Sequence, residues 1–348
     1  MPTVPAPLKL ALVYLAASLG GLVFHLAGLP LPWMIGPLVA TALLLFNDRI
    51  DVRIPVKTRP FGQGIVASQV GLAFSPAVFA SLLEMAPMLV GMAFLLIVIA
   101  FAIAVLLSRM GRISLSSAMV ATLPTSPVEA AVIGERYGFP AAPIVLSQTM
   151  RIATVVVLVP MAIVALDGHH GLSGNRFVGS FDPLGTGALM ALSLAGMAAF
   201  RKLGLSNPYF LGPLAVSSAV TAAGLDLPDY PSVILWAAQV VLGTWLGSNF
   251  RRSLFRSAGR LMTASVISTL LFISASAVIS ATLAPLLGLS WQTLVLASTP
   301  GGVTEMALTA KFLGVDVALI TAFHLVRIFI VMPLVPVLID RVHRFERP

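Results

Sequence analysis

Long apolar runs alternate with short polar segments along most of the chain. Residues 8–29, 87–107, 140–166, 261–287 and 315–339 each carry at most two charged side chains. A helix needs about 20 consecutive apolar residues to cross the hydrocarbon core of a bilayer. Each run is therefore predicted to be a transmembrane helix. This includes the first run, because no small-residue cleavage pattern marks it as a signal peptide.

Composition supports the same class of protein. Hydrophobic residues make up 58% of the 348 residues and charged residues only 10%, whereas soluble domains carry about 25% charged residues. The net charge of +8 would suggest a nucleic-acid partner in a soluble protein. Here the basic residues lie in short loops, where they set topology. The chain has no cysteine, which excludes disulfides, thiolate metal sites and cysteine nucleophiles.

The sequence repeats itself at one ungapped offset of 176 residues. The offset aligns isolated polar and helix-breaking residues as well as apolar ones, so each half is predicted to be one structural unit. We expect a first membrane repeat over residues 1–167, a linker over 168–182 that contains His169 and His170, and a second repeat over 183–348. The aligned pairs include Gly36 and Gly212, Gln63 and Gln239, Pro124 and Pro300, Glu129 and Glu305, and Arg151 and Arg327.

The distribution of basic residues predicts that the two repeats have opposite orientations. The loop 47–60 is basic in the first half, whereas its counterpart is acidic, with Asp226 and Asp229. The turn near Glu84 lacks basic residues, whereas its counterpart around residues 251–260 holds four. Because Lys and Arg remain on the cytoplasmic side, the halves are expected to be inverted, with both termini cytoplasmic.

Inverted halves require an odd number of crossings in each. We expect five in the first half, at residues 8–29, 32–47, 61–80, 87–107 and 140–166, and five in the second, at 184–200, 208–224, 232–250, 261–287 and 315–340. The segments 113–137 and 290–313 are broken by proline and glycine, and their arms are too short to cross. We interpret them as re-entrant helical hairpins. A single crossing with a broken middle is the alternative, which would make the repeats parallel.

Arg151 and Arg327 lie in the middle of predicted transmembrane helices. A charge at that depth costs at least about 3 kcal/mol, so each side chain should face the protein interior. Two roles are open. Arg151 and Arg327 could form ion pairs with Glu129 and Glu305, or their guanidinium groups could bind the anionic group of a substrate.

The two glutamates differ in local sequence. Ser126 and Glu129 form a capping box with proline at the first helical position, which explains Glu129 without further function. Gly302 is the counterpart of Ser126 and has no side chain that could cap the helix, so the capping box is incomplete at Glu305. The glutamate is shared although the capping serine is not, which favours a role in ion or proton coupling.

Half-helices that begin at mid-depth would direct free N–H groups toward a ligand. Together with the arginines they predict an anion-binding centre, with a static packing break as the alternative. The polar residues expected to line it, or to make inter-helix hydrogen bonds instead, are Ser126, Gly301, Gly302, Thr304, Gln148, His324, Gln63 and Gln239.

The residues also resemble a known family. The duplicated Pro-x-x-x-Gly-Pro-Leu segment (from Pro32 and Pro208), Leu-Pro-Thr-Ser-Pro-Val-Glu (from Leu123) and Thr-Pro-Gly-Gly-Val-Thr-Glu-Met (from Thr299) are similar to those of the bacterial AbrB-type duplicated membrane proteins. The resemblance implies an inner-membrane protein of about ten crossings. Members carry the labels ammonia monooxygenase and regulator of gene expression, so the resemblance implies the topology and not one settled function.

The pattern is typical of an all-α integral membrane protein that acts as a secondary transporter of a small anionic organic solute. An ammonia-oxidising enzyme would need copper or iron held by clustered ligands, and the five histidines are scattered. We therefore expect no enzyme activity, cofactor or metal. The loops are too short for a DNA-binding domain, so nucleic acid is not expected as a partner. A membrane sensor that affects gene expression indirectly is the alternative, and the oligomeric state, including a homodimer, is left open.

Overall fold

The computed structural model describes residues 6–46, 52, 54–123, 127–167, 182–205 and 207–346. Within these residues every regular element is a helix. The helices of the first half are α1 (Ala6–Leu26), α2 (Pro32–Phe46), η1 (Val56–Thr58), α3 (Arg59–Gly71), α4 (Pro76–Glu84), α5 (Ala86–Gly111), α6 (Leu115–Thr122), α7 (Pro127–Arg136) and α8 (Ala141–Asp167). Those of the second half are α9 (Pro183–Lys202), α10 (Pro208–Ala222), α11 (Ser232–Gly247), α12 (Arg252–Leu287), α13 (Trp291–Ser298), α14 (Val303–Leu313) and α15 (Val317–Glu346).

Helix bounds recur at the same offset of 176 as the sequence. Helices α2 and α10 begin and end at equivalent residues, and so do the short helices α6 and α13. Left-handed residues recur as well, since Arg112 (φ 53°) and Gly288 (φ 65°) are equivalent. The same breaks in the sequence therefore end the same helices. Nothing in the helix bounds tests the inverted orientation, which remains a prediction.

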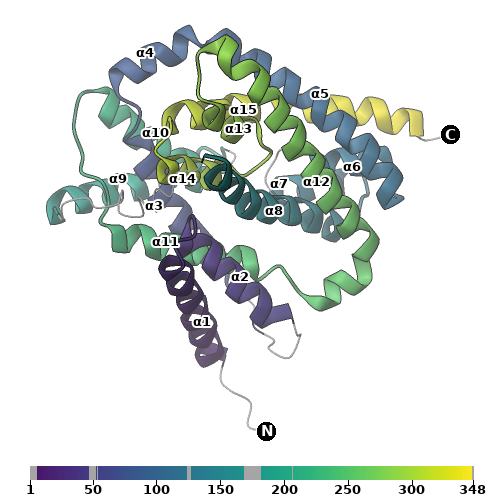
Figure 1. The fold of residues 1–348 in the computed structure, drawn as a ribbon, viewed down its shortest axis with the longest axis horizontal. Coiled ribbons are helices and arrows are strands. Elements are labelled where there is room, and N and C mark those ends of the chain that lie inside the picture. The colour runs from purple at the N-terminus through teal and green to yellow at the C-terminus, as the bar shows by residue number, and fades with distance from the viewer. Residues whose placement is uncertain are drawn as a thin grey trace. The chain divides into compact units, whose positions relative to one another are not determined.

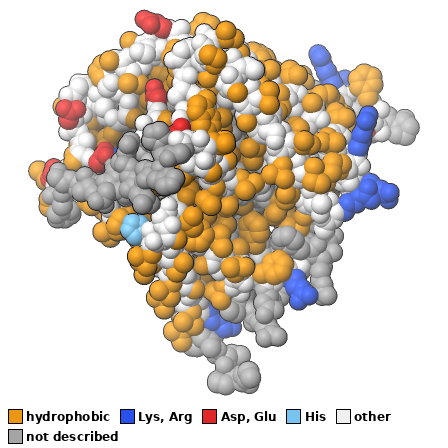
Figure 2. Space-filling model, viewed as in Figure 1, with side chains coloured by type: hydrophobic (Ala, Val, Ile, Leu, Met, Phe, Trp, Pro, Cys, Tyr) orange, Lys and Arg blue, Asp and Glu red, His pale blue; other side chains and the backbone are white. Residues whose placement is uncertain are grey.

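Six helices are long and apolar enough to cross a bilayer, among the described residues, and a bent pair would make seven. They include α1, α5, α8 and α9, together with most of α12 and all of α15. The exposed apolar side chains of α1 lie on one side of that helix at Leu8, Leu12, Leu15 and Leu19, each more than half exposed. Figure 2 shows hydrophobic side chains over most of the visible face. Such a surface is stable in lipid, and the predicted all-α integral membrane protein is confirmed.

The other predicted crossings differ from expectation. Residues 61–80 do not form one helix, because α3 and α4 are bent by 87° at the break between them. Helices α2, α10 and α11 contain 15, 15 and 16 residues, which gives lengths of about 22–24 Å. A full crossing needs about 30 Å. The sequence pattern located these helices to within three residues, but their lengths fall short of the full crossings that it predicted.

The described chain divides into two compact units, and neither is a sequence half. The first unit contains Met1–Leu83, Pro160–Arg252 and Ala307–Ala318, and the second contains Glu84–Val159, Ser253–Met306 and Leu319–Pro348. Each unit therefore combines equivalent helices from both repeats. The predicted division at residues 167 and 183 follows the repeat along the chain, and its linker 168–182 lies outside the described residues except for Asp182.

Glycines allow close helix packing in the first unit. Helices α1 and α2 lie side by side (Figure 1), and a Cβ on Gly36 would collide with the backbone of Gly20. The equivalent contact joins Gly212 of α10 to Gly196 of α9. The Gly-Pro segments of α2 and α10 are thus explained by backbone contact, which requires the absence of a side chain.

The two repeats also exchange partners in this unit. Gly247 of α11 packs on the Leu38 carbonyl of α2. Its counterpart Gly71 of α3 packs on the Leu214 carbonyl of α10, which is the equivalent of Leu38. Equivalent residues of the two repeats therefore make equivalent contacts in this unit.

The second unit has a large apolar core. Helix α5 contributes Leu96, Ala100 and Leu107, and α15 contributes Val331 and Ile339. All five are at most 3% exposed. This core surrounds the short helix α6, whose residues Ala118 and Met119 are fully buried. A polar residue beside these helices must consequently find its hydrogen bonds within the protein.

Candidate functional site

Arg151 of α8 binds the end of the short helix α6. Its Nη1 donates to the carbonyl oxygens of Thr122 (2.6 Å) and Leu123 (3.3 Å). Its Nη2 donates to Oε1 of Gln148, one turn earlier on the same helix. Nε2 of Gln148 in turn donates to the carbonyls of Val120 (2.9 Å) and Leu123 (3.0 Å). Arg151 is 5% exposed and Gln148 is fully buried.

Arg327 of α15 repeats this arrangement at the end of α13. It donates to the carbonyl oxygens of Thr299 and Gly301, each at 3.3 Å. His324 stands where the first half has Gln148, and its Nε2 lies 3.0 Å from the Leu296 carbonyl. Leu296 is the equivalent of Val120. Gln148 and His324, which the offset of 176 makes equivalent, therefore occupy equivalent positions one turn before each arginine.

The last carbonyl groups of a helix have no partner within the helix. In the membrane no water would satisfy them, and each unsatisfied group is costly. The two arginines and their neighbours supply the missing donors to α6 and α13. The sequence-based expectation placed the arginines opposite positive N-terminal helix ends. The structure instead places them at the C-terminal ends, where the helix dipole attracts a cation.

Positive charge is concentrated at these helix ends. The acceptors found for the two guanidinium groups are the carbonyl oxygens of Thr122, Leu123, Thr299 and Gly301 and the Gln148 amide. The two arginines are also close enough for their charges to repel each other. The ion pairs of Arg151 with Glu129 and of Arg327 with Glu305 stay a prediction.

Glu305 lies at the start of α14 and folds back over Gly302. A Cβ at Gly302 would meet the Glu305 carboxylate, the far end of a flexible side chain. Gly301 and Thr304 are buried beside it. Glu129 lies in the first turn of α7. Ser126, the predicted partner in its capping box, lies outside the described residues.

Gln63 and Gln239 belong to the first compact unit, whereas the arginines belong to the second. Both glutamines are buried, at 6% and 1% exposed. Nε2 of Gln239 has no hydrogen-bond partner among the described residues, and the side chain lines a cavity of about 10 Å³ with Trp33 and Trp236. Their predicted role in the same centre as the arginines stays a prediction.

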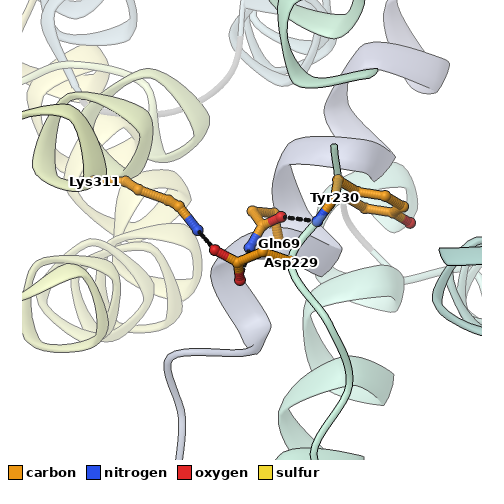
Figure 3. Close-up of polar contacts among 4 residues, drawn as sticks. All are labelled: Gln69, Asp229, Tyr230 and Lys311. Carbon is orange, nitrogen blue, oxygen red and sulfur yellow. Dashed lines mark hydrogen bonds and ion pairs between the residues drawn. The ribbon is translucent and has the colours of Figure 1, made fainter. Parts of the chain in front are cut away.

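A second polar cluster, in the first unit, was not predicted (Figure 3). Lys311 Nζ lies 2.8 Å from Asp229 Oδ2. Gln69 Nε2 donates to the other carboxylate oxygen of Asp229 at 2.6 Å, and Gln69 Oε1 accepts the backbone N–H of Tyr230 at 2.8 Å. The signal that could have indicated it is the opposite charge of Asp229 and Lys311 in otherwise apolar surroundings.

Metal ligands do not cluster in the part of the chain that the structure describes, where no group of three or more His, Asp or Glu side chains could hold a metal ion. The histidine nearest the candidate site, His324, is committed to the Leu296 carbonyl through Nε2. The chemistry available at the helix ends is therefore hydrogen-bond donation and positive charge.

Comparison with known proteins gives consistent matches over nearly the whole chain. The sequence model of the AbrB family, described as "Transition state regulatory protein AbrB", matches residues 33–343. "Uncharacterized protein YhjN" of Bacillus subtilis (strain 168) is 25% identical over 343 residues, which cover 92% of this chain and 89% of that protein. "Putative regulator AbrB" of Escherichia coli (strain K12) is 21% identical over 326 residues, with 93% and 92% covered.

Proposed function

The chain belongs to the AbrB family, and we propose that it is a secondary transporter of a small anionic organic solute across the bacterial inner membrane. The observation that carries the proposal is the burial of the Arg151 and Arg327 guanidinium groups at the ends of α6 and α13. The C-terminal ends of α6 and α13 each supply the equivalent of about half a negative charge. Two such ends offset about one of the two positive charges. An anionic solute would supply the remainder.

The broken helices support the same proposal. Transporters with internal repeats bind their substrates near the midplane, at interruptions of the helices. The chain is interrupted after α6 and after α13, and the arginines donate hydrogen bonds to backbone carbonyls at these interruptions. Gly301, Gly302 and Thr304, at the second break, are further substrate-contact candidates, together with Ser126, Gln148, His324, Gln63 and Gln239.

Glu129 and Glu305 are the proposed coupling residues. Each lies in the first turn of the helix that follows a break. A carboxylate that gains or loses a proton there would change the net charge beside the solute, which couples solute binding to a proton gradient. We propose transport without a cofactor, and no enzymatic activity, for this chain.

The decisive experiment is uptake by the purified protein in liposomes. We expect at least one member of a panel of labelled mono- and dicarboxylates to accumulate, with uptake reduced at least tenfold in Arg151→Gln and Arg327→Gln. Arg201→Gln, at the exposed end of α9, is the matched control and should retain uptake. If no solute in the panel is bound or taken up, and the two substitutions change only thermal stability, the proposal is wrong.

Indirect regulation is the second candidate, favoured by the name of the Escherichia coli relative. A transporter that depletes an inducer would alter gene expression without contacting DNA. Deletion of the gene, followed by restoration of the solute pool, separates the two roles. Expression that returns to normal supports transport, whereas an expression change that persists supports sensing.

A further inference from the structure

Helix α12 has a buried stripe of hydroxyl groups that its counterpart lacks. The positions are spaced to lie on one side of a helix. They are at most 4% exposed, and they are Ser265, Ser268, Thr269, Ser276 and Ser280. The equivalent positions of α5 are also at most 4% exposed, but all are apolar: Leu89, Met92, Ala93, Ala100 and Ala104.

The stripe meets Arg151 at a small cavity in the second unit. The cavity has a volume of about 10 Å³, which is close to the space that one water or one oxygen atom of a ligand needs. Its polar lining consists of Thr122, Ser147, Arg151, Ser265, Ser268 and Thr269. The apolar side chains of Ile103, Leu107, Ala121 and Phe272 complete the lining.

Two of these polar groups have no partner among the described residues. They are Nε of Arg151 and Oγ of Ser268, on side chains that are 5% and 4% exposed. The neighbouring hydroxyls are already used, since Ser147 Oγ lies 2.8 Å from Ser265 Oγ. Thr269 Oγ1 donates to the Ser265 carbonyl at 2.7 Å. A buried donor without an acceptor is unfavourable, so two of them at one cavity indicate that an acceptor oxygen, from a water or from a ligand, occupies it.

We propose that this cavity binds a carboxylate oxygen of the solute, through donation from Arg151 Nε–H and Ser268 Oγ–H. The inference rests on the proposed transport function. Nε of Arg327 also has no partner among the described residues, but of the two arginines Arg151 is the one that lines this cavity. The counterparts of Ser147, Ser265 and Ser268 are Phe323, Leu89 and Met92, which carry no hydroxyl, so the hydroxyl donors belong to the Arg151 side.

Ser268→Ala gives a sharp test, because Ser268 Oγ makes no hydrogen bond within the described protein. The variant should unfold at the same or a higher temperature than the wild-type protein without ligand. Its affinity for acetate and succinate should fall at least about tenfold, since a hydrogen bond to a charged group is lost. Thermal unfolding in detergent, titrated with the sodium salts and with sodium chloride at equal ionic strength, measures both quantities.

Two further variants control for local disruption. Ser280→Ala lies on the same buried stripe but outside the cavity and should keep wild-type affinity. Ser268→Thr keeps the hydroxyl and should also bind. If acetate and succinate raise the unfolding temperature equally in Ser268→Ala and the wild type, the subsite is wrong.

The remaining outcomes separate this inference from the transport proposal. Carboxylate uptake that requires Arg327 but is unaffected by Ser268→Ala overturns the subsite and leaves transport intact. Absence of any carboxylate effect on the wild type overturns the subsite and would mean that the cavity holds only water. Absence of uptake for the whole solute panel contradicts the transport proposal itself.

Discussion

Gln148 and His324 hold equivalent carbonyl oxygens with different side chains. Gln148 Nε2 donates to the Val120 carbonyl, and His324 Nε2 lies at hydrogen-bond distance from the Leu296 carbonyl, 176 residues later. A neutral imidazole with its proton on Nε2 presents one donor. The Gln148 amide presents two, one to the Val120 carbonyl and one to the Leu123 carbonyl. What the two repeats share at this position is therefore the hydrogen bond to the helix end and not the residue type.

This relationship predicts that Gln148→His is tolerated. The imidazole should replace the bond to Val120 but not those to Leu123 and Arg151, so the free energy of unfolding should fall by about 1 kcal/mol. Gln148→Leu also leaves the Val120 carbonyl without this donor, at a further cost of about 1–3 kcal/mol. Thermal unfolding of both variants in the same detergent decides the matter. Equal destabilisation by the two substitutions would mean that the bond to the helix end is not the relevant contact.

Arg327→Lys should destabilise the protein although it preserves the charge. A lysine ammonium is a point charge and cannot hold the geometry with which the guanidinium joins the Thr299 and Gly301 carbonyls. Loss of one hydrogen bond from a charged group costs about 1.5–3 kcal/mol. Arg201→Lys, at the exposed end of α9, is the control and should be neutral within about 0.5 kcal/mol. An unchanged unfolding temperature in Arg327→Lys would contradict the role assigned to the Arg327 guanidinium.

The sequence predicted the helical membrane class because hydrophobic length is a direct consequence of the bilayer. The offset of 176 also located equivalent helix ends, such as those of α6 and α13, because the same Pro and Gly residues interrupt both copies. It placed α2 to within one residue, but it did not predict that α2 is too short to cross a bilayer or that the chain bends between α3 and α4. Composition alone does not distinguish a helix that spans lipid from an apolar helix that packs on its neighbours.

The site was predicted only in part. Arg151 and Arg327 were identified because a buried charge is costly and rare. Their partners were not, because the acceptors are backbone carbonyls, which carry no sequence signal. The hydroxyl stripe of α12 was missed for another reason. Ser265 and Ser268 become conspicuous only when the equivalent positions Leu89 and Met92 are known to be equally buried.

Gly36→Ala should be among the most damaging conservative changes. The added Cβ would overlap the Gly20 backbone, and overpacking of this kind costs about 1–3 kcal/mol. Gly91→Ala provides the matched control, because no atom lies within 4 Å of the position of its Cβ and alanine is favoured over glycine in a helix by up to about 1 kcal/mol. Opposite shifts of the unfolding temperature are expected, and a neutral Gly36→Ala would refute the close crossing of α1 and α2.

The polar cluster of Figure 3 predicts that removal of the Lys311 charge destabilises the protein less than removal of the buried Gln69 amide. The Asp229 side chain is 43% exposed and that of Lys311 is 18% exposed, so Lys311→Gln should cost less than about 1 kcal/mol. Gln69 is only 3% exposed. Gln69→Leu leaves the Tyr230 N–H unpaired and should cost about 1–3 kcal/mol. Unfolding at low and at 1 M salt separates the two effects. Only the cost of Lys311→Gln should disappear at high salt, where the Debye length is about 3 Å.

Tyr230 should make the protein sensitive to alkali. Burial raises the pKa of the phenol above its usual value of 10, and the hydrogen bond with Ser68 at 3.2 Å opposes this shift in part. The folded state therefore holds the proton more tightly than the unfolded chain. The resulting stabilisation is complete below pH 10 and is lost as the pH rises from 10 toward the higher pKa of the folded state.

Tyr230→Phe should consequently show a shallower decline of unfolding temperature above pH 10. Ser68→Ala keeps the titrating phenol and should keep the steep decline. If Tyr230→Phe and the wild type lose stability in parallel above pH 10, the buried phenol does not control alkaline unfolding.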